Sequence, residues 1–112
     1  MAEREDYSAI QYLYLTTTGR RTGLPREIEI WFVHDAGRFY ILAEHFHRAQ
    51  WVQNILAEPR VRVRMADREF TATARVLDAG RDAARYKRAQ QLEREKYDWG
   101  DGLPVEITPD PV

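Results

Sequence analysis

Apolar and polar residues along most of this chain alternate with a period of two, the pattern of a strand that buries one face. The alternation is clearest between residues 60 and 65, where three arginines alternate with Val61, Val63 and Met65. Near the N-terminus, Leu13 and Leu15 share one face of such a segment while tyrosines and threonines share the other. The pattern predicts strands at residues 9–17, 27–34, 38–43, 60–65, 69–77 and 103–108.

Two segments depart from this period and are predicted to be helices. Over residues 48–58, Trp51 and Ile55 lie four positions apart and Pro59 ends the pattern. Residues 80–97 are rich in good helix formers, with Asp78 placed to cap them. The apolar stripe of this second helix is thin, so we expect it on the surface or against a partner. That stripe consists of Tyr86, Ala89, Leu92 or Glu93, and Tyr97.

The predicted order is three strands, a helix, two strands, a helix and a last strand, joined mostly by short turns. Short turns between consecutive strands predict an antiparallel sheet, and a small sheet tends to curl to hide its edges. Ala72 and Ala74, on one face of the fifth strand, suit such curvature. We therefore expect a mainly β (α+β) fold, a small antiparallel barrel of about six strands flanked by two helices. The expected boundaries are a flexible arm at residues 1–8, a single barrel domain at 9–108 and a tail at 109–112.

Composition narrows the classes of function. With 112 residues, the chain is long enough for one modest core and too short for two. A net charge of −1 argues against general binding to polyanions. The chain has no cysteine, which excludes disulfides, thiolate metal sites and cysteine nucleophiles. Because no apolar run approaches the ~20 residues of a membrane span and the first residues do not resemble a signal peptide, a cytoplasmic location is expected.

The most distinctive stretch is the turn after the first strand, where two glycines flank two arginines and a threonine. Glycine allows positive φ and the close approach of a ligand, and consecutive backbone N–H groups in such a turn can bind an anion. Guanidinium groups suit phosphate because they bind it bidentately and keep their charge. The turn therefore fits a phosphate or carboxylate site, although a solvated arginine-rich hairpin turn fits it too. The residues concerned are Gly19, Arg20, Arg21, Thr22, Gly23 and Arg26.

No nucleophile–base pair is visible, so the catalytic residues stay unassigned, with His45, His47 and Tyr97 as candidates. The two histidines lie two residues apart and face the same side, but a third metal ligand is missing because Glu44 points the other way, so no metal site is predicted. Histidine titrates near neutral pH, so either one fits a hydrogen-bond donor or proton source beside a cofactor, or a surface residue. Tyr97 and Trp99 fit a cover over a bound ring, or side chains that hold the last helix in place.

The arginine face at residues 60–64 has two interpretations. A groove for single-stranded nucleic acid would need exposed aromatic residues beside the arginines, but the aromatic residues fall mostly on faces predicted to be buried. Ion pairs with Glu27 and Glu29 across the sheet are the favoured interpretation.

Two motifs resemble those of one protein family. The first is a leucine–threonine strand followed by Gly-Arg-Arg-Thr-Gly and Pro-Arg, at residues 15–26. The second is a helix-to-strand step, Trp-Val-Gln-Asn-Ile-Leu-Ala-Glu-Pro-Arg-Val, at residues 51–61. With the intervening strand at the expected spacing, residues 12–77 resemble the deazaflavin-dependent nitroreductase family of the flavin/deazaflavin oxidoreductase superfamily.

This resemblance implies a split β-barrel that binds coenzyme F(420), a deazaflavin with a phosphate and an oligoglutamate tail. It assigns the anionic part of the cofactor to the arginine turn and the ring system to the segment after the third strand. Trp51 corresponds to an indole in the pocket wall. The expected cofactor-binding residues are Gly19, Arg20, Arg21, Thr22, Gly23, Arg26, Ala43, Glu44, His45 and Trp51.

The implied activity is hydride transfer from reduced F(420) to an electron-poor small molecule such as a quinone, an enone or a nitroaromatic. Three alternatives remain: an FMN-binding barrel of the pyridoxamine-phosphate-oxidase type, a non-catalytic cofactor carrier, and a small barrel that binds RNA through the arginine face. Related barrels often share the flavin site between two chains, so the resemblance also implies a homodimer. Neither a nucleic acid nor a membrane is expected as a partner.

Overall fold

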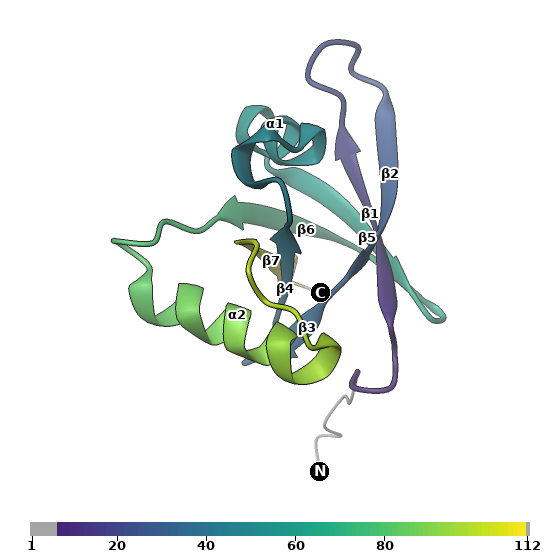
Figure 1. Ribbon diagram of the computed structural model, residues 1–112. Coiled ribbons are helices and arrows are strands. Elements are labelled where there is room, and N and C mark those ends of the chain that lie inside the picture. The colour runs from purple at the N-terminus through teal and green to yellow at the C-terminus, as the bar shows by residue number, and fades with distance from the viewer. Residues whose placement is uncertain (1–6, 112) are drawn as a thin grey trace.

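The strands of the computed structural model form one antiparallel sheet in the order β2-β1-β5-β6-β7-β4-β3, and the structure describes residues 7–111. The sheet curls into a split barrel with helices against it, so the predicted fold class is confirmed (Figure 1). The strands are β1 (Tyr12–Thr18), β2 (Pro25–Trp31), β3 (Val33–Asp35), β4 (Arg38–Ala43), β5 (Arg60–Met65), β6 (Arg68–Val76) and β7 (Leu103–Pro109). The helices are a 3₁₀ turn η1 (Phe46–Arg48), α1 (Gln50–Ala57) and α2 (Ala83–Tyr97).

The predicted second strand is divided at Phe32, which raises the number of strands in the described chain from six to seven. β2 pairs with β1 and β3 pairs with β4, so this one segment joins the two edges of the sheet. At the division, the N–H of Phe32 donates to the hydroxyl of Tyr97 (3.1 Å), and its carbonyl accepts from Lys96 Nζ (3.1 Å). Side chains of α2 therefore replace the strand partner that Phe32 lacks, which lets the sheet turn a corner there.

The core lies inside the barrel, and the predicted inner faces of the strands are confirmed. Val61, Val63 and Met65 are buried while the arginines between them are exposed. Leu13 and Leu15 are fully buried on β1, where alternate residues face outward. Burying side chains of this size stabilises the fold by about 1.5–3 kcal/mol each.

Both helices differ from their predicted bounds. α1 begins at Gln50 because Ala49 has extended backbone angles, which separates it from η1. α2 begins at Ala83, since the Asp78 carboxylate accepts the N–H groups of Gly80 and Arg81 (2.8 Å each) and closes a separate turn. Asp78 therefore does not cap the helix as predicted. α2 packs against β3, β4 and β7 and buries Ala89 and Glu93 (Figure 1).

The described ends of the chain are packed against the barrel. Tyr7, placed by the sequence in a flexible arm, is buried and contacts the rings of Phe32 and Phe39. Ser8 follows in a turn and is exposed, whereas residues 1–6 of that predicted arm lie outside the described residues. In the predicted tail, the N–H of Asp110 donates to the carbonyl of Thr71 (3.0 Å). None of the helices between residues 7 and 111 has the length and apolar character needed to cross a membrane.

Candidate functional site

The arginine turn joins β1 to β2, and glycine is favoured at its two glycine positions for different structural reasons. Gly23 has a φ of +73°, in the left-handed region that glycine tolerates best. At Gly19, a Cβ would lie 3.1 Å from the carbonyl oxygen of Leu24, so a side chain would push the two sides of the turn apart. The N–H of Gly19 donates to this same carbonyl and that of Gly23 donates to the carbonyl of Gly19 (2.8 Å each). These two backbone donors are therefore used inside the turn and are not free for an anion.

Asn54 of α1 holds the turn in place. Its Oδ1 accepts from the backbone N–H (3.2 Å) and from Nη1 (3.0 Å) of Arg20, and its Nδ2 donates to the hydroxyl of Thr17 (3.2 Å). Gln50 accepts a further bond from Nη2 of Arg20 (2.8 Å). Arg20, expected to bind an anion, thus uses much of its guanidinium to join the turn to α1. Asn54 lies in the tryptophan-containing motif, but only the structure shows its partners.

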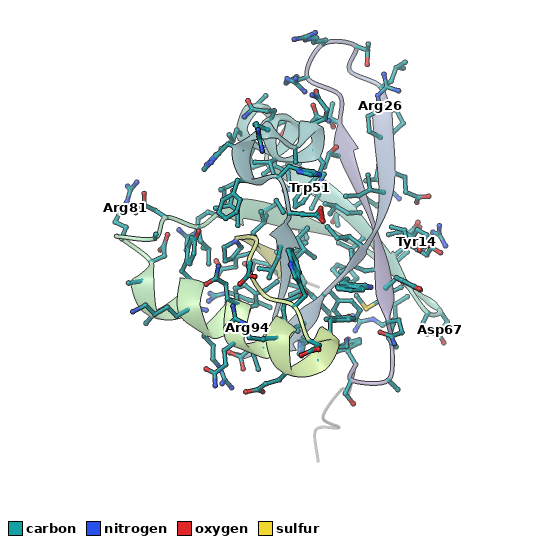
Figure 2. The ribbon with its side chains drawn as sticks, viewed as in Figure 1. Tyr14, Arg26, Trp51, Asp67, Arg81 and Arg94 are labelled. Carbon is teal, nitrogen blue, oxygen red and sulfur yellow. The ribbon has the colours of Figure 1, made fainter. Side chains whose placement is uncertain are left out.

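A cavity of about 410 Å³, here called the arginine pocket, lies between the turn and α1. Arg21 and Arg26 line it, and within residues 7–111 neither side chain makes an ion pair or a hydrogen bond. Figure 2 shows Arg26 on the β1–β2 hairpin and Trp51 beneath α1. The two arginines therefore supply positive charge that no carboxylate of the described chain neutralises. The pocket is lined by Gly19, Arg20, Arg21, Thr22, Arg26, Ile28, Gln50, Trp51 and Asn54.

A second cavity of about 610 Å³, here called the tryptophan cleft, lies beside the first. Trp51 lines both cavities, and the two share β2 as a wall, with Ile28 facing one and Ile30 the other. A flat aromatic ligand with an anionic tail could therefore extend from one cavity into the other past Trp51. The cleft is lined by Tyr12, Glu29, Ile30, Trp31, Leu42, Glu44, His45, Ala49, Trp51, Glu93 and Trp99.

Glu93 is the most unusual residue of this cleft. Its side chain is 0% exposed, and neither carboxylate oxygen has a hydrogen-bond partner in the described chain. Burial raises the pKa of Glu93 to about 8, although nearby Lys96 acts in the opposite direction. The sequence left open whether Leu92 or Glu93 lies on the thin apolar stripe of the last helix, and it assigned Glu93 no chemistry. A glutamate within an apolar stripe was the available signal.

The remaining predicted site residues are dispersed. His45 lines the cleft with its imidazole 3.6 Å from the Glu44 carboxylate, whereas His47 is exposed and lines neither cavity. Gly23 and the buried Ala43 line neither cavity. Tyr97 stacks on Trp31 with ring centroids 4.5 Å apart, and burial raises its pKa to about 12. Its hydroxyl is used at Phe32, so Tyr97 holds the helix in place.

No metal site is found among residues 7–111, where no group of three or more acidic or histidine side chains could hold an ion. The arginine face of β5 carries ion pairs: Arg64 with Glu27 (3.4 Å), Arg62 with Glu69 (3.7 Å) and Arg60 with Asp110 (2.8 Å). The predicted pairing across the sheet is thus confirmed for Glu27. Glu29 instead accepts from the hydroxyl of Tyr14 (2.8 Å).

Replacing Asn54 with alanine is expected to lower the free energy of unfolding by about 2–3 kcal/mol, because Thr17 and the Arg20 backbone lose partners at a buried position. Urea denaturation measures this change. Gln50→Ala is the matched control, since the Gln50 side chain makes a single, exposed hydrogen bond in the described chain, to the same arginine, and its loss should cost under about 0.5 kcal/mol. Equal effects of the two substitutions would contradict the role given to Asn54.

Solved structures with the same fold support a split-barrel class. A structure of the F(420)-H(2)-dependent reductase FDR-A is 23% identical, with a TM-score of 0.68, covering 88% of this chain and 93% of that one. The heme storage protein HutZ from Vibrio cholerae is 18% identical, with a TM-score of 0.75, covering 93% and 84%. A structure described as a domain-swapped dimer is 23% identical, with a TM-score of 0.68, covering 88% and 79%. At these identities the likeness shows the fold alone.

The family follows from the sequence model of the F(420)H(2)-dependent quinone reductases, which matches residues 3–106. The chain therefore belongs to the F(420)H(2)-dependent quinone reductase family, a family of oxidoreductases. This confirms the resemblance inferred from the two motifs.

Proposed function

We propose that this protein binds reduced coenzyme F(420) across the arginine pocket and the tryptophan cleft, and that it reduces an electron-poor small molecule such as a quinone, an enone or a nitroaromatic. One observation carries the proposal: one cavity holds two arginines that have no ion pair within residues 7–111, the other cavity is an aromatic cleft, and Trp51 lines both. Family membership supports the choice of a deazaflavin.

The arginine pocket fits the anionic end of the cofactor. Arg21 and Arg26 can each donate charge-assisted bonds to a phosphate or carboxylate without first breaking an ion pair in the described chain. Thr22 keeps its hydroxyl proton available, because its oxygen accepts from the N–H of Leu24. Arg20 contributes positive charge and holds the turn against α1. The anion would thus be bound mainly by side chains.

The tryptophan cleft fits a planar ring. Trp31, Trp51 and Trp99 supply flat apolar surfaces of the kind that line cofactor sites and exclude water. When bound, the reduced deazaflavin supplies a hydride, and the protein supplies position, a dry site and a proton. Glu44 and His45 lie at the cleft, so they would contact the ring or the acceptor rather than the phosphate.

The test is quenching of tryptophan fluorescence by F(420) and, separately, by FMN, followed by turnover assays with the reduced cofactor and menadione, nitrobenzene or cyclohexenone. We expect saturable quenching by F(420), because Trp51 lies between the two cavities, and oxidation of the reduced cofactor by at least one acceptor. Tight binding of FMN instead would assign the protein to the oxidase type. Binding of F(420) without any turnover would make it a carrier, and binding of neither cofactor would refute the proposal.

We also propose that the protein works as a homodimer. Tyr12 and Trp31 are 45% and 39% exposed at the cleft, where a second chain could cover them, and one structurally similar protein is a domain-swapped dimer. Light scattering during gel filtration tests this proposal, and the mass of a single chain at micromolar concentration would contradict it.

A further inference from the structure

Glu93 is the one buried side chain whose carboxylate oxygens have no partner within residues 7–111. A buried polar group without a partner costs about 1–3 kcal/mol, and such groups in a folded protein call for an explanation. Glu106, the other buried glutamate of the described chain, differs from Glu93 in its partners. It is also buried, but it accepts from the hydroxyl of Tyr40 (2.9 Å) and lies 3.3 Å from Arg85. The fold thus pairs the buried carboxylate of Glu106, whereas Glu93, a buried residue in the wall of the tryptophan cleft, has no hydrogen-bond partner for its carboxylate in the described chain.

Lys96 lowers the pKa of Glu93 but forms no ion pair with it in the described chain. Lys96, one turn along α2, points its ammonium at the carbonyl oxygens of Ile10 (2.8 Å) and Phe32 (3.1 Å). Tyr97, on the same helix, uses its hydroxyl at the division between β2 and β3. The other titratable groups that line the cleft are Tyr12 of β1, Glu29 of β2, and Glu44 and His45 after β4.

We propose that the carboxyl group of Glu93 is the proton donor of the reaction, giving its proton to the electron acceptor in the tryptophan cleft. This inference rests on the proposed function. Glu93 is then a catalytic residue on α2. This role explains why a glutamate is buried on the side of this helix that packs against the barrel.

The balance of atoms is simple for a quinone. The acceptor takes a hydride from the reduced cofactor and becomes a hydroquinone monoanion. The O–H bond of the Glu93 carboxyl breaks, its proton goes to the remaining phenolate oxygen, and the hydroquinone is complete. Glu93 is left as a carboxylate and regains a proton from water when the product leaves. No further oxidant or reductant is needed.

The proton affinities fit this order of events. Burial raises the pKa of Glu93 to about 8, so the group holds its proton at neutral pH, where an ordinary glutamic acid is ionised. A phenolate oxygen has a pKa of about 10, like that of tyrosine, and therefore takes the proton from Glu93. General acids whose pKa lies near the working pH contribute roughly 10²–10⁴-fold to the rate.

Glu93→Gln tests the proposal, because it keeps the shape of the side chain and a hydrogen-bond donor but cannot release a proton. With reduced F(420) and menadione, we expect kcat to fall about 100-fold. In the wild type, kcat should decline as pH rises through about 8, since the acid form is lost, and this decline should be absent in the variant. The affinity for F(420), measured by tryptophan quenching, should be the same in both proteins.

Two further variants separate proton donation from structure. Glu93→Asp keeps an acid and should recover part of the rate that Glu93→Gln loses. His45→Asn removes the competing proton donor at the cleft and should leave the decline near pH 8 in place. If Glu93→Gln stays within about twofold of the wild type, or if His45→Asn abolishes the decline, the proposal is overturned.

A measurement without cofactor distinguishes failure of this inference from failure of the proposed function. Infrared spectra of the unliganded protein at pH 7 should contain a protonated-carboxyl band that disappears in Glu93→Gln. Absence of the band in the wild type overturns the role of Glu93, even if the protein is an active reductase. If the band is present but neither binding of F(420) nor turnover is observed, the proposed function fails, and the role of Glu93 as proton donor fails with it.

Discussion

Replacing both Arg21 and Arg26 with alanine is expected to weaken the binding of F(420) about 100-fold. Each arginine lines the arginine pocket without an ion pair in the described chain, so its charge is available to the phosphate and tail of the cofactor. A hydrogen bond to a charged group contributes roughly 1.5–3 kcal/mol of free energy. Because the side chains of Arg21 and Arg26 are both exposed, we use the lower figure for each. Two such losses sum to about 3 kcal/mol, which corresponds to about 100-fold in Kd.

The measurement is quenching of tryptophan fluorescence at low salt, because screening weakens exposed charge pairs as ionic strength rises. Arg62→Ala is the matched control: it removes an exposed arginine on the outer face of β5, away from both cavities. The deazaflavin without its phosphate and tail is the control ligand and should bind the double variant as well as the wild type. Unchanged affinity of the double variant for intact F(420) would refute the assignment of the arginine pocket.

The strands were predictable from the sequence because their period of two reflects which side chains the barrel buries. Val61, Val63 and Met65 alternate with arginines, and the structure buries those three residues. The division at Phe32 was not predictable from this signal. Trp31, Phe32 and Val33 are all apolar, and the corner depends on Tyr97 and Lys96, which arrive from a helix more than sixty positions later in the chain.

The sequence pointed to a cavity where one short segment forms much of its wall. Gly19, Arg21 and Arg26 of the arginine turn were expected to hold the anionic part of a cofactor, and all three line the arginine pocket, whereas Gly23 does not. Their part in binding a cofactor stays a prediction. The different roles of neighbouring arginines could not be predicted, because Arg20 is distinguished from Arg21 only by Asn54 and Gln50 of a distant helix. Local sequence reports which groups a segment carries, whereas their partners depend on how the barrel closes.

Replacing Glu93 with methionine is expected to stabilise the protein, by an amount that grows as pH rises from about 4.5 to about 8. The carboxyl has a pKa of about 8 when folded and an ordinary value of 4.5 when unfolded. Below pH 4.5 the carboxyl is protonated in both the folded and the unfolded protein. The free energy of unfolding of the wild type is then lowered only by the smaller cost of burying a polar group without a partner in the described chain. Between the two values the unfolded state ionises while the folded state does not, so the wild type loses stability by up to roughly 1.4 kcal/mol per pH unit.

Urea denaturation of the two proteins at pH 4, 6 and 8 measures this effect, and the difference should reach several kcal/mol at pH 8. Methionine has a similar length and no charge, and apolar replacement of a buried ionisable group is often stabilising. Glu95→Met, an exposed glutamate on the same helix, is the control and should show no such dependence on pH. A difference that stays constant from pH 4 to pH 8 would mean that Glu93 is ionised in the folded protein. A variant that is more stable but inactive would show that the barrel keeps an unfavourable buried acid because its reaction uses it.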